Sequence, residues 1–366
     1  MAGEPELKSA TRQRIVNPLT LAWGLVIVLL GLTVSWVYLS DDPHTELNDE
    51  NADQAEHEQS IAEDMPTIPE VSTPNEFPVT VTHETPTDVD QPSMSSQIAL
   101  KPAPNENLLI RGDNGLKPAL GPDGLIAWKE YARPFSGDDQ LPRIAILVTD
   151  VGLNSKSSNA AIDKLPGQVD MAFSPYGRNL QTWMDKARAK GHEGFLMIPT
   201  EPLNYPDNDP GPHTLIADLS ERDNLLRLDW ALSQVAGYVG VVNHMGSKFT
   251  ASEEALTPIL NDLNNRGLML VDSRSTRFSM AARIARRLGM PRAMNDRYID
   301  NVITTDEIQR QLGELEKTAK TFGAALGLAR AIPLTINEIA AWAETLEQKG
   351  FQLVPITAIA NRQPIK

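Results

Sequence analysis

A regular alternation of short apolar runs and helical segments between residues 143 and 362 most constrains the fold of this chain. Runs without polar alternation are typical of strands that are buried on both faces of a parallel sheet. Strands that alternate with helices in this way predict a parallel sheet with its helices outside. The apolar runs are Ile144–Val148, Val169–Phe173, Phe195–Ile198, Tyr238–Val242, Leu268–Val271, Ala324–Leu328 and Phe351–Val354.

Capping signals mark the ends of the helical segments. Three pairs have the capping-box spacing, in which a threonine begins the helix and a glutamate follows three residues later. These pairs are Thr250 with Glu253, Thr304 with Glu307 and Thr335 with Glu338. Glycines that suit a left-handed C-terminal cap follow helical stretches at Gly267, Gly289, Gly323 and Gly350. Seven or so such units favour an irregular β/α barrel, with an open doubly wound sheet as the alternative.

In either architecture the loops after the strands carry the functional site. His244 is one of three histidines in the body of the chain. A hydrogen-bonded structural role remains open for His244, and a simple ion pair remains open for Asp272 and Arg274. The polar residues at predicted strand ends are Thr149, Asp150, Glu201, Asn243, His244, Asp272, Ser273, Arg274, Asp296, Asp300, Asn301 and Arg330.

The N-terminal region predicts a membrane anchor. Residues 19–39 carry no charge, and about 20 such residues cross a bilayer core of about 30 Å as a helix. We therefore predict a cytoplasmic segment 1–17 and a single transmembrane helix 18–40. Basic residues precede this span, so the body is expected in the periplasm, outside the inner membrane. A cleaved signal peptide is the alternative, although the run exceeds a typical signal core of roughly 7–15 residues.

Charge divides the rest of the chain. Residues 41–100 contain 15 acidic residues and no Lys or Arg, whereas residues 101–366 have a net charge of −1. We predict a disordered, acidic, proline-rich linker over 41–104, because it has too little apolar surface to offset the entropy of ordering. Residues 105–142 are a further linker or a peripheral lead-in. Nucleic acid is not an expected partner, since phosphate binding needs clustered basic residues. The absence of cysteine excludes disulfides and thiolate chemistry.

Four motifs resemble those of the divergent polysaccharide deacetylase family. They are IAILVTDVG (144–152), GHEGFLMIPTEPLNYP (191–206), VNHMGSKFT (242–250) and LMLVDSRST (268–276). The resemblance covers nearly the whole body and identifies residues 143–362 as a divergent polysaccharide deacetylase domain. It implies a distorted (β/α)7 barrel and zinc-assisted hydrolysis of acetyl groups on carbohydrate polymers.

The resemblance also implies roles for single residues. In the family's first motif, IDDLG, the first Asp is the general base and the second a metal ligand; here these positions are Thr149 and Asp150. In GHEVLLHLPMEP the later His and the final Glu are expected metal ligands; here they are Met197 and Glu201. The late motif IGIGHP supplies a His as general acid or transition-state stabiliser, and its position holds Arg330.

These replacements weaken the case for catalysis. A threonine hydroxyl is no substitute for a carboxylate base, a thioether suits zinc poorly, and Arg330 cannot cycle a proton. We expect Asp150 and Glu201 to be vestigial ligands that bind a divalent metal weakly or not at all. Thr149, His244, Asp272, Arg274 and Arg330 are the remaining catalytic candidates. Arg330 is predicted to pair with Asp150 or Glu201 in place of the lost cation.

Three functions remain open. The first is a degenerate domain that binds a cell-envelope polysaccharide or an envelope protein, with Tyr176, Tyr205 or Trp183 stacking on sugar rings. The second is an active hydrolase whose rearranged metal site uses Asp150, Glu201 and His244. The third is a non-catalytic envelope scaffold, in which the cleft is a remnant.

Overall fold

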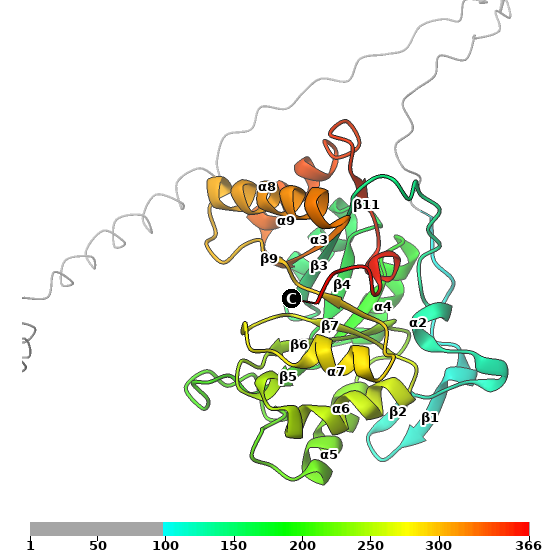
Figure 1. Cartoon of the computed structure of the whole chain (residues 1–366). Coiled ribbons are helices and arrows are strands. Elements are labelled where there is room, and N and C mark those ends of the chain that lie inside the picture. The colour runs from blue at the N-terminus through cyan, green and yellow to red at the C-terminus, as the bar shows by residue number, and fades with distance from the viewer. Residues whose placement is uncertain (1–97, 366) are drawn as a thin grey trace, which may run out of the picture. The chain divides into compact units, whose positions relative to one another are not determined.

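The computed structural model describes residues 98–365 (Figure 1). The predicted cytoplasmic segment 1–17, the predicted transmembrane helix 18–40 and most of the predicted linker 41–104 lie outside this part. Over residues 98–365, no helix has both the length and the apolar character needed to cross a bilayer.

A curled parallel sheet forms the core. Its strands are β3 (Arg143–Val151), β4 (Asp170–Phe173), β5 (Gly194–Thr200), β6 (Gly240–Met245), β7 (Met269–Asp272), β8 (Arg292–Met294), β9 (Arg297–Tyr298), β10 (Ala324–Arg330) and β11 (Gln352–Leu353). They run in the order β8-β7-β6-β5-β4-β3-β10-β9, and β11 pairs with the start of β3. All these pairings are parallel. The predicted parallel sheet is therefore confirmed.

The sheet curls so far that one short segment reaches both of its ends. β8 pairs with β7 and β9 pairs with β10. Between them, the N–H of Asn295 donates to the carbonyl of Asp272, and the N–H of Asp296 donates to the carbonyl of Leu326. The segment between the two ends of the sheet is thus two short pieces, β8 and β9, which the sequence analysis did not predict. The predicted strand Phe351–Val354 is the two-residue β11, which pairs with the start of β3.

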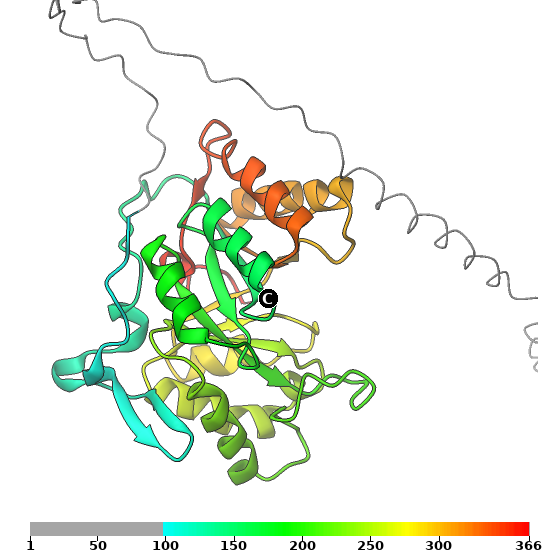
Figure 2. The same ribbon diagram turned by 180° about the vertical axis from the view of Figure 1, so that it is seen from behind.

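Helices cover the outside of the sheet (Figure 1, Figure 2). They are α3 (Ser155–Lys164), α4 (Leu180–Ala189), α5 (Glu221–Leu232), α6 (Glu253–Asn265), α7 (Ala281–Arg287), α8 (Thr305–Phe322) and α9 (Pro333–Ala343). The predicted cap at Thr304 is confirmed, because its side chain accepts from the N–H of Glu307. The other two were wrong: Ser252 caps α6, and Thr335 lies inside α9, where its hydroxyl bonds to Asp300. Gly323 ends α8 with a left-handed φ of 80°.

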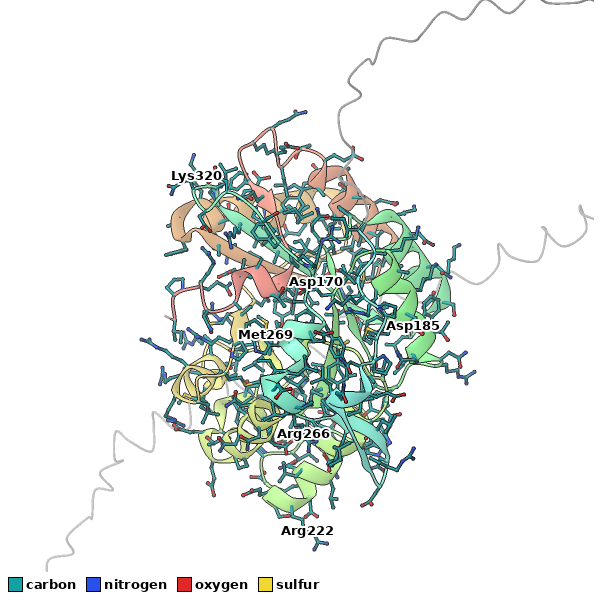
Figure 3. All side chains as sticks on the ribbon, turned by 90° about the vertical axis from the view of Figure 1, so that its right-hand side faces the viewer. Asp170, Asp185, Arg222, Arg266, Met269 and Lys320 are labelled. Atoms are coloured by element: carbon teal, nitrogen blue, oxygen red, sulfur yellow. The ribbon has the colours of Figure 1, made fainter. Side chains whose placement is uncertain are left out.

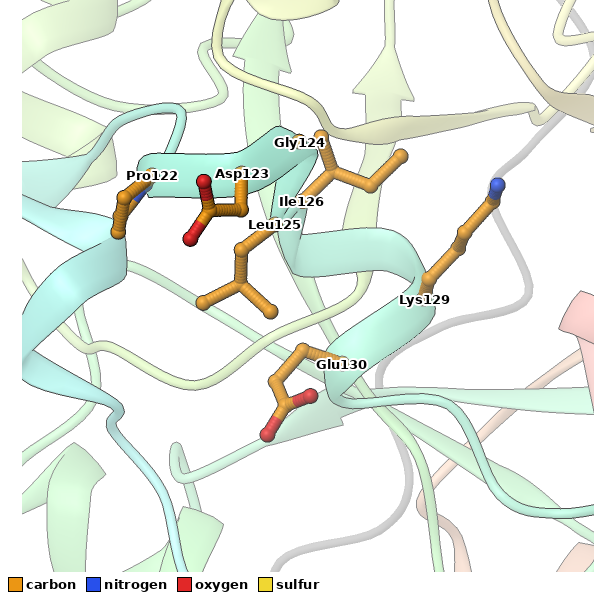
Figure 4. A pocket seen from close by; sticks show the side chains of 7 residues that line it. All are labelled: Pro122, Asp123, Gly124, Leu125, Ile126, Lys129 and Glu130. Atoms are coloured by element: carbon orange, nitrogen blue, oxygen red, sulfur yellow. The ribbon is translucent and has the colours of Figure 1, made fainter.

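Residues 98–142 pack along the amino edge of the sheet. They include the hairpin of β1 (Leu109–Gly112) and β2 (Gly115–Pro118) and the short helix α2 (Ala127–Glu130). Leu100 donates its N–H to the carbonyl of Arg188, so the end of the predicted linker is already part of the packed body. A shallow pocket of about 480 Å³ lies beside α2 (Figure 4). Because α2 contacts the start of β7 through Trp128 and Gly267, this pocket is remote from the carboxyl ends of the strands.

Two buried carboxylates join the amino edge to the C-terminal segment. Asp170 lies deep in the body (Figure 3) and accepts from the N–H of Ile356 at 2.6 Å. Glu193 accepts from the N–H of Arg133 at 2.8 Å and from the hydroxyl of Thr357. Burial raises the pKa of Glu193 to about 7. Burial and the neighbouring Glu193 charge raise the pKa of Asp170 well above its ordinary value.

Removing one of these charges is expected to change how stability depends on pH. Because the pKa of Glu193 is higher in the folded chain, this group destabilises the fold as pH rises from about 4.5 to about 7. Asp170→Asn should change the melting temperature less at pH 5, where the Glu193 carboxyl is protonated, than at higher pH. At pH 8 the substitution should raise the melting temperature by a few degrees. A gain of about 1 kcal/mol in stability corresponds to about 2–4 °C in a domain of this size.

Thermal melts at both pH values measure this difference. Asp185→Asn, which changes an exposed carboxylate on α4, is the control, and its effect should not vary with pH. An Asp170→Asn effect of the same size at pH 5 and pH 8 would contradict the assignment.

Candidate functional site

Side chains from three strands meet around Asp150 at the carboxyl edge of the sheet. The N–H of Asp150 lies 3.3 Å from the sulfur of Met197 on β5. His244 lies near the carboxyl end of β6, the strand that pairs with β5. Burial lowers the pKa of His244, and the Asp150 carboxylate opposes that shift. The hydroxyl of Thr149 donates to the carbonyl of Ala329 at 3.2 Å and lies 3.3 Å from the Asp150 carboxylate.

The backbone is strained at this edge. Six non-glycine residues have a positive φ in the described part of the chain, and three of them lie at the carboxyl end of a strand of the sheet or just after it. These are Asp150 with a φ of 65°, Met245 with 56° and Arg274 with 50°. A left-handed conformation costs an ordinary residue about 1–2 kcal/mol, and such residues cluster at functional sites. The strain therefore supports the carboxyl edge as the functional face.

A second group of side chains ties β6 to β7. Asn243 accepts from the N–H of Ser273 at 2.8 Å and donates to its hydroxyl at 2.7 Å. Asp272 accepts from the N–H of Arg274 at 2.8 Å and from the hydroxyl of Ser279 at 2.9 Å. Burial raises the pKa of Asp272, and these hydrogen bonds oppose that shift. The carboxylate of Asp272 thus caps the turn that holds Arg274.

Glu201 bonds to a lysine that the sequence analysis did not single out. The ammonium of Lys248 lies 3.0 Å from one Glu201 oxygen, and the N–H of Ala217 donates to the other at 2.8 Å. Lys248 also bonds to Asp218 at 2.7 Å. Hydrogen bonds to Asp218 and Glu201 raise the pKa of Lys248, so it stays charged near neutral pH. The only signal in the sequence was its place in VNHMGSKFT.

The prediction that Arg330 pairs with Asp150 or Glu201 was wrong. Arg330 instead forms an ion pair with Asp300, with 3.5 Å between its Nε and a carboxylate oxygen. The backbone N–H of Arg330 donates to the same carboxylate at 3.0 Å. Arg330 is the last residue of β10, and Asp300 follows β9, the strand that pairs with β10, so the two residues lie at the same place on the edge of the sheet. Lys248 supplies the positive charge at Glu201.

These side chains do not fit a catalytic zinc ion. Catalytic zinc sites use about three protein ligands, which are nitrogen, thiolate or carboxylate donors. Across residues 98–365, no group of three or more His, Asp or Glu side chains is arranged to hold a metal. The Met197 sulfur faces Asp150, and both oxygens of Glu201 already accept hydrogen bonds within the protein. Asp150 and Glu201 as residual metal ligands remain a prediction.

A curled parallel sheet with strained polar residues at its carboxyl edge defines a barrel-type α/β protein. Within that class, the chain belongs to the divergent polysaccharide deacetylase family, whose sequence profile matches residues 146–360. The family resemblance predicted from the four motifs is therefore confirmed.

Three similar proteins support this assignment. The crystal structure of an uncharacterized protein from Agrobacterium tumefaciens C58 is 37% identical, with a TM-score of 0.65, over 67% of this chain and 99% of the other. An uncharacterized protein of Haemophilus influenzae is 27% identical over 213 residues, which is 58% of this chain and 74% of the relative. The uncharacterized protein YibQ of Escherichia coli K12 is 23% identical over 213 residues, 58% of this chain and 64% of the relative.

Removing the Lys248 charge should destabilise the fold. Lys248→Met leaves the Glu201 carboxylate, whose side chain is 5% exposed, without its cation. Since Lys248 is itself partly exposed, we expect a loss of about 1–2 kcal/mol, or a few degrees in melting temperature at pH 7.

A double-mutant cycle isolates this contact. Glu201→Gln combined with Lys248→Met should lose less stability than the two single changes added together. Lys317→Met, at an exposed pair with Glu314, is the matched control and should have little effect. If the effects of the two single substitutions are additive, the ion pair contributes nothing to the free energy of unfolding.

Proposed function

We propose that this protein is a membrane-anchored envelope protein whose barrel binds a cell-envelope glycan without zinc-dependent deacetylation. Membership of the divergent polysaccharide deacetylase family supports a carbohydrate as the ligand. The proposed binding face is the carboxyl edge around Asp150, since ligands of parallel α/β proteins bind there.

The observation that carries the proposal is the ion pair of Glu201 with Lys248. A cationic ammonium beside Glu201 neutralises the carboxylate that the family resemblance gives to the metal. Met197 offers a soft, neutral sulfur at the next ligand position, and Thr149 offers no basic carboxylate. Without an activated water and a base, a bound acetylated sugar would stay intact.

An active hydrolase with a rearranged site is the second candidate. The effect of the Asp150 charge on the pKa of His244 favours it, because a carboxylate that interacts with an imidazole is a common acid–base pair. The same pair also serves a binding role, in which both groups form hydrogen bonds with sugar hydroxyls. Glu201, the third member of that rearranged site, is bound to Lys248 and Ala217.

Acetate release and binding separate the two candidates. Full-length protein in detergent should bind N-acetylated envelope oligosaccharides, as measured by calorimetry, and release no acetate above background. Addition of zinc, cobalt or a chelator should not change either result. Acetate release that stops with a chelator or with His244→Ala would establish the hydrolase instead.

The anchor is a separate part of the proposal. We propose that residues 18–40 cross the inner membrane once and that the body lies in the periplasm, because basic residues precede the apolar run and acidic ones follow it. Protease added to spheroplasts should then digest the body while the cell stays intact. A body that becomes accessible only after lysis would contradict this orientation.

A further inference from the structure

A groove of about 670 Å³ opens beside the candidate site. It lies between the loop that follows β3 and the loop that follows β4, and it begins at Gly152, two residues after Asp150. Its volume is in the range of small-molecule binding sites. The groove thus extends the carboxyl-edge site toward α3 and α4.

One part of the groove is aromatic and held rigidly. Tyr176 and Trp183 both line it, and both are half-buried. The Tyr176 hydroxyl accepts from the N–H of His213 at 3.1 Å, and its ring centroid lies 5.3 Å from that of Trp230. His213 and Trp230 stack on each other at 3.5 Å. Residues from two other segments therefore fix the Tyr176 ring, which offers a flat apolar surface at little entropic cost.

The remaining lining is polar and available to a ligand. Arg178 and Thr182 are exposed, and Asn179 forms no capping bond at the start of α4. Within residues 98–365, Arg178 takes part in none of the ion pairs. Lys186 differs, because it bonds to Asn159 and to Asp163 at 2.8 Å.

The groove carries a positive charge in a nearly neutral body. Residues 101–366 have a net charge of −1, and the side chains that line this groove include Arg178 and no Asp or Glu. A guanidinium recognises a carboxylate through two parallel hydrogen bonds. A ligand that matches this lining has a ring for the aromatic part and a carboxylate for Arg178.

We propose that the groove binds a carboxylate-bearing sugar, with the sugar face against Trp183 or Tyr176 and its carboxylate on Arg178. This proposal rests on the proposed function and narrows it, because it selects acidic glycans over neutral ones. Asn179 and Thr182 supply hydrogen bonds for sugar hydroxyls. Arg178 is a specificity residue, and it takes no part in any reaction.

Two oligosaccharides of equal length test the selection. One is a tetrasaccharide of alternating N-acetylglucosamine and N-acetylmuramic acid, which carries carboxylates, and the other is neutral chitotetraose. Full-length protein in detergent should bind the acidic one about three- to fivefold more tightly at low salt, as one partly exposed ion pair allows. Calorimetry measures both affinities, and added salt should reduce the preference.

Arg178→Gln should bind both oligosaccharides equally, with the melting temperature unchanged because the side chain is exposed. Arg222→Gln is the matched control, since Arg222 is an exposed arginine on α5 that does not line the groove, and it should keep the preference. Trp183→Leu should weaken binding of both oligosaccharides.

The outcomes distinguish this proposal from the proposed function. Equal binding of both oligosaccharides by the unaltered protein, or an unchanged preference in Arg178→Gln, overturns the role of Arg178 and leaves glycan binding in place. Failure to bind either oligosaccharide overturns both proposals. Acetate release that a chelator stops overturns only the proposal that the protein is not a hydrolase. The role of Arg178 stands in that case if the preference for the acidic oligosaccharide is lost in Arg178→Gln.

Discussion

The burial of β3 on both edges and both faces is the constraint on which the rest of the body depends. β10 pairs with it over seven residues along one edge, while β11 and then β4 pair along the other. Residues 144–148 are fully buried. Because buried backbone groups must find partners, this strand has one register. That register sets Thr149 opposite Arg330, and Asp150, with a φ of 65°, lies where the pairing with β4 shifts between Val148 and Val151.

Much of this architecture follows from patterns in the sequence. Continuous apolar runs such as Ile144–Val148 predict buried parallel strands, and the structure has β3 there. The pieces β8 and β9 had no such pattern, because three residues and two residues are too short to show a period. Thr335 has the spacing of a cap, yet its hydroxyl bonds to Asp300, a contact that depends on tertiary structure.

In the candidate site, the positions of the residues could be predicted from the sequence, but their bonding partners could not. Strand ends could be located, so Asp150, Glu201 and His244 were found from the sequence. Their partners could not be assigned, because a partner depends on how loops far apart in the chain fold back. Glu201 meets Lys248, which is 47 residues away, and Arg330 meets Asp300, which is 30 residues away. By charge alone, either Arg330 or Lys248 could be the partner of Glu201. The path of the loop after β6 brings Lys248 to this carboxylate.

Residues 98–100 pack at the end of the sheet opposite to the candidate site. Ile98 and Leu100 form hydrogen bonds through their backbone with Arg133 and Arg188 beside the beginnings of the strands, whereas Asp150 and the groove lie where the strands end. The two ends of the sheet are therefore built by separate parts of the chain, so the loops that line the groove can change in sequence while the packing of the lead-in segment is preserved.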